Sequence, residues 1–225
     1  MKRILVIAAM AAACGGSSSS AVDHNRAGSG SSTLKVTSTV DVIVSATTPA
    51  TSPLTNFSVT LKDGLNANVT GATVTVHNAA FGDVALAYAG GGSYTASKTS
   101  YPSGDLSLTV VNGTDKVQGV VLGYPGTHAI NAPVAGSTVP VSTALHVSWT
   151  TPTVAKAATI SLSSGGFSVQ APDTGAYDIP AGSNGRTGGQ TVTVIRSNEV
   201  DIAGGLPGSS MKVTVTDQGG SFTVQ

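Results

Sequence analysis

The sequence predicts an all-β protein with two tandem antiparallel β-sandwich domains, which follow a signal peptide and a flexible tether. Three observations support this fold class. Short runs of alternating apolar and polar residues recur along the chain, with turn residues roughly every 8–12 positions. No 3.6-residue helical pattern extends beyond the N-terminal segment. Only 10% of the residues are charged, and Thr, Ser, Val, Gly and Ala dominate, as in strands and turns.

The N-terminal segment, residues 1–13, reads as a signal peptide. A charged start, Met1 to Arg3, precedes a short apolar run and the small residues Ala11 to Ala13. The run is shorter than the about 20 residues that span a bilayer. Cys14, the only cysteine of the chain, follows at once.

This arrangement resembles the lipobox of bacterial lipoproteins, with Ala11 where that family usually has Leu. The resemblance implies a diacylglycerol on the Cys14 thiol, cleavage before Cys14, and acylation of the new amine by a fatty acid such as palmitate. Gly15 in place of Asp favours the outer membrane. The alternative is an ordinary secretory signal, cut near Ala13, that leaves a free thiol. In either case we expect a location in the cell envelope.

Residues 14–33 are expected to form the lipidated cysteine and its tether. The segment is dense in Gly and Ser and has almost no apolar side chains, so it cannot offset the entropy of ordering its backbone. A flexible coil of this length spans roughly 20–25 Å. His24 and Arg26 lie in it and are interpreted as solvated.

The first domain is expected over residues 34–130. Its strands should alternate between a buried and a solvated face, with Gly90 to Gly92 providing positive φ and Asn112-Gly113 a tight turn. The expected strands are 34–37, 40–44, 57–62, 72–76, 84–88, 94–96, 106–111 and 116–122.

Part of this domain resembles bacterial Ig-like and transthyretin-like modules. About 50 residues carry the resemblance, which is loose because it consists mostly of turns and alternation. It implies a fold and no catalytic residue. The matching stretches are Leu61-Lys62-Asp63-Gly64, 69–76, Gly92-Ser93-Tyr94 and 106–110.

The second domain is expected over residues 131–225, after a junction at Asn131-Ala132-Pro133. Its segment 145–152 resembles the "L-x-V-x-W-x-x-P" strand of fibronectin type III domains, in which the Trp packs between the sheets. Trp149 is therefore interpreted as a core anchor, and an exposed sugar platform is the alternative. The other expected strands are 159–162, 167–169, 177–180, 191–196, 211–215 and 222–224.

Charge and motifs exclude several function classes. The formal net charge is zero, and no basic patch suited to nucleic acid is visible. No nucleophile elbow, zinc spacing or phosphate-binding glycine loop occurs. The four histidines are spread along the chain, with His146 on the strand face opposite Trp149. We therefore expect no enzyme activity, no cofactor and no metal.

Calcium is the one ion that the sequence raises. Glu199 and Asp201 share a strand face, and Asp173 and Asp178 flank a turn. Neither pair matches a dense calcium loop. All four acids are interpreted as ordinary solvated residues.

The leading functional hypothesis is a lipid-anchored, non-catalytic envelope protein that serves as a structural or protein-interaction module. Gly-rich loops would supply contact surfaces, and 184–189 is expected to be the most flexible of them. The alternative is a carbohydrate-binding or adhesion module, for which Tyr101-Pro102 and Tyr124-Pro125 are the candidate loops. An enzyme of unrecognised type is a third, weaker possibility.

Overall fold

A computed structural model describes residues 24–44, 54–153, 155–164, 166–184 and 186–225. Within these ranges the chain is all-β and contains no helix, so none of the described residues forms a helix able to cross a membrane. The predicted fold class is confirmed in this respect. The expected signal peptide, Cys14 and the first part of the tether lie outside the described residues.

The described residues form eighteen strands. In chain order they are β1 (Asn25–Ser31), β2 (Lys35–Val44), β3 (Thr55–Lys62), β4 (Thr73–Asn78), β5 (Gly82–Gly90), β6 (Ser93–Lys98), β7 (Leu106–Asn112), β8 (Asp115–Leu122), β9 (Ile130–Ala132), β10 (Thr138–Val139), β11 (Leu145–Trp149), β12 (Ala157–Leu162), β13 (Ser168–Ala171), β14 (Ala176–Ile179), β15 (Gly188–Gln190), β16 (Val192–Asp201), β17 (Ser210–Gln218) and β18 (Phe222–Val224).

Two apolar cores organise these strands. The first core lies among β2 to β8 and β17, and in β3 every second residue is buried in it while the residues between are partly buried. The second core lies among β11, β12, β14, β16 and β18 and contains Trp149, which is 3% exposed. Trp149 is thus the core anchor that the sequence predicted.

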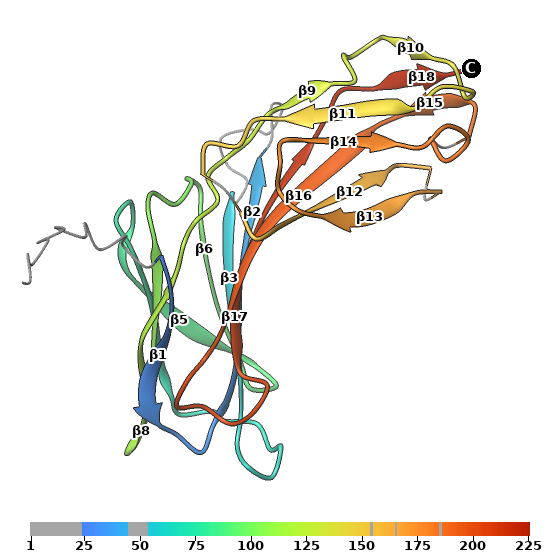
Figure 1. The fold of residues 1–225 in the computed structure, drawn as a ribbon. Coiled ribbons are helices and arrows are strands. Elements are labelled where there is room, and N and C mark those ends of the chain that lie inside the picture. The colour runs from blue at the N-terminus through green and yellow to red at the C-terminus, as the bar shows by residue number, and fades with distance from the viewer. Residues whose placement is uncertain (1–23, 45–53, 154, 165, 185) are drawn as a thin grey trace, which may run out of the picture.

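The hairpin of β16 and β17 belongs to both cores (Figure 1). The first half of β16 pairs with β12 and places Val192 and Val194 in the second core. Strand β17 pairs in parallel with β2 from Ser210 to Asp217 and places Met211 and Val213 in the first core. The hairpin therefore links the two cores by continuous backbone hydrogen bonding.

The domain division expected at residue 130 stays a prediction, and both strand pairing and core packing cross that position. Ile202 and Val215, which lie far past that boundary, pack in the first core. Among the described residues one run of hydrogen-bonded strands, in the order β1-β8-β7-β4-β5-β6-β3-β2-β17-β16-β12-β13, passes through both parts of the chain. Alternation along β17 predicted a strand correctly but carried no information about which strand would be its neighbour.

The end of the expected tether is also different, because residues 25–31 form strand β1. This strand pairs antiparallel with β8 over its length. Its glycines permit the close approach: a Cβ at Gly30 would lie 2.0 Å from the carbonyl oxygen of Lys116. The Gly- and Ser-rich composition, with no apolar alternation, predicts a flexible coil. In the structure this segment instead covers the edge of a sheet.

Several local predictions are confirmed. Asn112 pairs with Asp115 across a tight turn in which Gly113 has a φ of 61°. Gly90, Gly91 and Gly92 all have positive φ. The segments 34–37 and 40–44 were expected as two strands and form the single strand β2.

Candidate functional site

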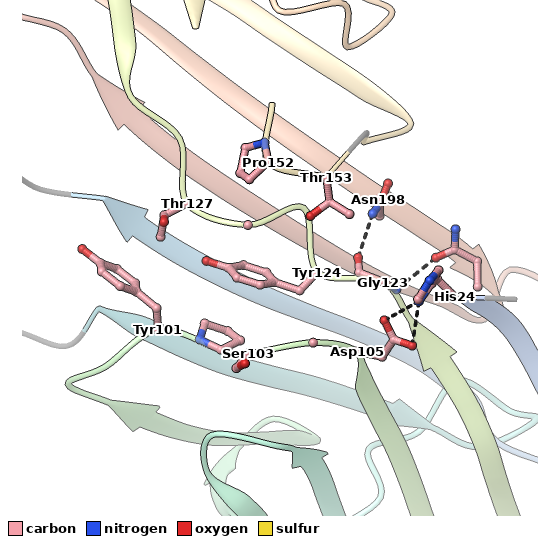
Figure 2. Close-up of a pocket in the computed structure, with 14 residues that line it drawn as sticks. His24, Tyr101, Ser103, Asp105, Gly123, Tyr124, Thr127, Pro152, Thr153 and Asn198 are labelled. Carbon is pink, nitrogen blue, oxygen red and sulfur yellow. Dashed lines mark hydrogen bonds and ion pairs between the residues drawn. The ribbon is translucent and has the colours of Figure 1, made fainter. Parts of the chain in front are cut away.

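A cleft of about 810 Å³ opens where the two cores meet (Figure 2). Four parts of the chain line it: the loop from Tyr101 to Asp105, the segment 123–127 after β8, the loop that holds Pro152 and Thr153, and the start of β1. Asn198 of β16 completes the wall. The cleft therefore combines segments from the first core, the second core and the connection between them.

The structure brings together the two tyrosines that the sequence singled out. Tyr101 lies in the loop between β6 and β7 and is half-buried, while Tyr124 follows β8 and is 9% exposed. Both rings line the cleft with their hydroxyl groups toward the same end (Figure 2). The two candidate loops thus form one site.

Asn78 fixes the loop that carries Tyr101. Its side chain, at the end of β4, is fully buried. The amide nitrogen donates to the carbonyl oxygens of Ser103 at 3.0 Å and Asp105 at 3.1 Å, and the amide oxygen accepts from the Ser103 backbone N–H at 3.0 Å. An irregular loop without strand partners is in this way held in one conformation.

Asn198 and Arg196 fix the segment that carries Tyr124. The Asn198 amide donates to the Gly123 carbonyl at 2.7 Å, and Arg196 Nη1 donates to the Pro125 carbonyl at 2.9 Å. The same two side chains also bond to Thr153 and Lys156. Arg196 Nη2 donates to the Thr153 carbonyl, and Asn198 accepts from the Lys156 N–H.

Arg196 is itself held by Asp173 in a buried ion pair. Nε lies 3.1 and 3.0 Å from the two carboxylate oxygens, and Nη2 lies 2.6 Å from Oδ2. Trp149 Nε1 and the Ala155 N–H also donate to this carboxylate. Burial alone would raise the pKa of Asp173, but these hydrogen bonds outweigh burial and hold the pKa below its ordinary value.

His24 and Asp105 are in contact in the lining of the cleft (Figure 2). His24 Nδ1 lies 2.9 and 3.0 Å from the two carboxylate oxygens. The pair ties the start of β1 to the loop that carries Tyr101. His24 is exposed, as expected of a tether residue, but it has a partner.

The Tyr124 hydroxyl is buried and has no hydrogen-bond partner among the described residues. Burial raises the pKa of Tyr124, and the nearby Tyr101 raises it further, whereas Arg196 acts in the opposite direction. The phenol is therefore neutral at physiological pH. A buried hydroxyl without a partner is uncommon, because it loses its hydrogen bonds to water and gains none.

The acids considered for calcium are not equivalent in the structure. Asp173 is buried against Arg196, so its interpretation as a solvated residue is wrong. Asp178 is exposed and pairs with His146 Nδ1 at 2.6 Å. Glu199 and Asp201 are exposed on β16. Within the described ranges no group of three or more His, Cys, Asp or Glu side chains is placed to hold a metal.

The loop 184–189, expected to be the most flexible, contains a fixed point. Asn184 is fully buried, and its amide donates to the carbonyl oxygens of Pro140 and Thr143. Gly185 lies outside the described residues. The turn-forming residues predict a mobile loop here. In the structure the Asn184 amide instead ties the start of this loop to the segment 140–143.

Arg196 and Asn198 were not among the predicted site residues, although a signal for them existed. Val192 and Val194 alternate on the buried face of β16, and the period of two places residues 196 and 198 on the same face. A charged residue in phase with buried valines indicates a buried ion pair. Its partner, Asp173, could not be identified from the spacing.

No protein-family model matches the chain, and no curated protein matches its sequence. Solved structures match distantly. Fibronectin(III)-like modules of CbhA from Clostridium thermocellum match with a TM-score of 0.30 and 14% identity, over 85% of this chain and 94% of that one. The BSP domain of a biofilm associated protein matches with a TM-score of 0.27 and 16% identity, over 86% of this chain and 30% of that one.

The adhesin InvE from Yersinia pseudotuberculosis matches with a TM-score of 0.27 and 14% identity, over 80% of this chain and 58% of that one. The chain thus spans less than two thirds of the last two proteins. These matches amount to a distant similarity in structure to fibronectin III-like and Ig-like β modules, some of them from bacterial surface proteins.

Proposed function

We propose that this chain is a lipid-anchored, non-catalytic protein of the bacterial cell envelope that serves as a structural or protein-interaction module. The observation that carries the proposal is the β16–β17 hairpin, which passes through both cores. Bending the molecule between its cores would break the backbone hydrogen bonds of this hairpin. Such a scaffold holds its terminal loops at a fixed separation, as a spacer or a platform for partners requires.

The buried side chains at the junction support the same role. Arg196 and Asn198 bond to the segment that connects the cores and to Thr153 and Lys156, which lie before β12. Two domains joined by a mobile linker have no need of such bonds. The stiffness therefore comes from side chains as well as from strands.

The anchor is proposed from the segment before the described residues. A signal-type sequence ends in small residues before Cys14, and the resemblance to lipoproteins implies acyl chains on this residue. Each buried CH₂ contributes about 0.8 kcal/mol, so several chains would hold the protein at a membrane. Gly15 favours the outer membrane as that site.

The test is metabolic labelling with an alkyne analogue of palmitate in a Gram-negative host that expresses the full chain. We expect label on the wild type and recovery in the outer-membrane fraction. Cys14→Ser should abolish the label and release the protein from membranes, whereas Ser17→Ala, the matched control, should change neither. An unlabelled wild type, or a Cys14→Ser variant that stays labelled, would contradict the anchor.

A second candidate function is carbohydrate binding or adhesion. A specific observation favours it: Tyr101 and Tyr124, which lie 23 positions apart in the sequence, line one cleft. Aromatic side chains in a concave site with convergent polar groups are characteristic of ligand binding. The two candidate functions are compatible, because an anchored module can carry a glycan site.

A further inference from the structure

We propose that the cleft between the two cores binds a neutral saccharide, with a sugar ring against Tyr101 and a sugar hydroxyl bonded to the Tyr124 hydroxyl. The inference rests on the second candidate function, carbohydrate binding, and does not depend on the lipid anchor. Four properties of the cleft support it: its size, its charge, the chemistry of its polar groups and the buried Tyr124 hydroxyl.

The size of the cleft suits a small ligand. Its volume of about 810 Å³ lies within the range of about 300–1,000 Å³ that is typical of small-molecule sites. Three of its four lining segments are fixed before any ligand arrives, because Asn78, Arg196 and Asn198 hold them. A site with preset walls loses little conformational entropy when it binds.

The charge of the cleft favours a neutral ligand. Among the lining residues only His24 and Asp105 can carry charge, and they are paired with each other. The Tyr124 phenol is neutral, since burial raises its pKa. Arg196 lies behind the wall with its donors directed to Asp173 and to backbone carbonyls. An ionic ligand would lose hydration here without meeting an unpaired opposite charge.

The polar groups of the lining are mostly hydroxyls. Five side chains supply them: Tyr101, Ser103, Tyr124, Thr127 and Thr153. A hydroxyl both donates and accepts, as the hydroxyls of a sugar do. The Asp105 carboxylate adds an acceptor that a sugar hydroxyl can also use. A proline-rich peptide also stacks on aromatic side chains, but proline has no N–H for these acceptors, so the sugar fits better.

The Tyr124 hydroxyl identifies where the ligand would make its deepest contact. This hydroxyl is buried, and within the described part of the chain it has no hydrogen-bond partner. Figure 2 shows it directed toward Tyr101 and Thr127. The half-buried Tyr101 side chain packs against the first core and would have to turn aside to admit a ligand hydroxyl, while Asn78 keeps the backbone of its loop in place. The partner that Tyr124 lacks would then come from the sugar.

The test is isothermal titration calorimetry on the full chain, purified in detergent. The probes are the neutral disaccharides cellobiose, lactose and N,N′-diacetylchitobiose, with sialyllactose as a charged counterpart and poly-L-proline as a peptide. The variants are Tyr124→Phe, which removes one hydroxyl, and Tyr101→Ala. The matched control is Tyr88→Phe, because Tyr88 is 44% exposed and does not line the cleft.

We expect at least one neutral disaccharide to bind the wild type at millimolar concentration or below. Tyr124→Phe should weaken binding by about tenfold, which corresponds to about 1.4 kcal/mol. Tyr101→Ala should weaken it by more, and Tyr88→Phe should leave it unchanged. Circular dichroism on each variant confirms that it is folded.

Binding that is equal in the wild type, Tyr124→Phe and Tyr101→Ala would overturn the cleft as the site and leave carbohydrate binding standing. Folded protein that binds none of the neutral sugars would overturn both. Binding of sialyllactose or poly-L-proline, without binding of any neutral disaccharide, would overturn the proposal that the ligand is a neutral saccharide. Loss of affinity in Tyr101→Ala without any change in Tyr124→Phe would overturn the role of the Tyr124 hydroxyl.

Discussion

Arg196 and Asp173 form an ion pair in which both side chains are fully buried, with Nη2 2.6 Å from Oδ2. Buried charges are costly unless they are paired and fully hydrogen-bonded. Here the guanidinium also donates to the carbonyls of Pro125 and Thr153, and the carboxylate also accepts from Trp149. The pair therefore positions the connection between the two cores and the wall of the cleft together.

Removing one member of this pair should destabilise the protein strongly. Arg196→Met keeps the apolar stem and removes the charge, so Asp173 would stay buried without its cation. We expect a loss of about 3–5 kcal/mol in the free energy of unfolding, measured in urea. The double variant Arg196→Met/Asp173→Leu should recover part of this loss, since it leaves no unpaired charge.

The exposed pair of His146 and Asp178 is the matched control. His146→Gln should change the free energy of unfolding by no more than about 0.5 kcal/mol. A loss in Arg196→Met as small as that of His146→Gln would show that the buried pair does not hold the junction.

Stability should fall with decreasing pH in two steps. Burial is the main cause that lowers the pKa of His128 from its ordinary 6.5, and Arg196 adds to it. The unfolded chain therefore takes up a proton at higher pH than the folded chain does, and stability drops as the pH falls below about 6.5. The pKa of Asp173 is also lowered, so its stabilisation is complete above 3.8 and is lost below that value.

Urea titrations across pH measure both steps. His128→Gln keeps a donor for the Val194 carbonyl, which His128 Nε2 contacts at 3.1 Å, but it cannot be protonated. This variant should lose the step at higher pH, which we assign to His128, and keep the step at lower pH, which we assign to Asp173. An unchanged upper step in His128→Gln would assign that step to another group.

The two most buried tyrosines should respond in opposite ways to loss of the hydroxyl. The Tyr94 hydroxyl donates to the Val69 carbonyl and accepts from the Ala72 N–H, so Tyr94→Phe should cost about 1–2 kcal/mol. The Tyr124 hydroxyl has no partner among the described residues, so Tyr124→Phe should leave the stability of the ligand-free chain unchanged or raise it by about 1 kcal/mol. Thermal unfolding of both variants measures this, and similar losses would contradict the unpaired state of Tyr124.

Strand β1 should depend on its glycines. At Gly28 φ is +78°, and an added Cβ would lie 2.6 Å from the Gln118 carbonyl oxygen. Gly28→Ala should loosen β1 and raise hydrogen exchange in 25–31 and 115–122 by at least about tenfold, on the order of 1.4 kcal/mol of local stability. Gly71→Ala, where no atom lies within 4 Å of the added Cβ, is the control. Equal exchange in the two variants would contradict the tight pairing of β1 with β8.

The strands were predictable from sequence where one face is buried. Alternation located β3, β7 and β17 because each has a core on one side only. Strand β1 was missed because its glycines serve close backbone approach, and the same composition is typical of a coil. Short strands such as β10, with two residues, have no detectable period.

The site was predictable in its parts but not in its assembly. Tyr101 and Tyr124 were both candidates because each is an aromatic residue beside a proline in a loop. That they share a cleft depends on Asn78 and Asn198, whose bonds join residues 25 and 75 positions apart. No local rule connects residues at such separations, so only the folded arrangement reveals them.

The central claim is that the β16–β17 hairpin makes the two cores one cooperative unit, and scanning calorimetry tests it most directly. Leu61→Ala in the first core and Ile160→Ala in the second should each cost about 2–5 kcal/mol. We predict a single transition in the wild type that each variant shifts as a whole to lower temperature. Two separate transitions would contradict the claim, if Leu61→Ala lowered the midpoint temperature of one and Ile160→Ala that of the other.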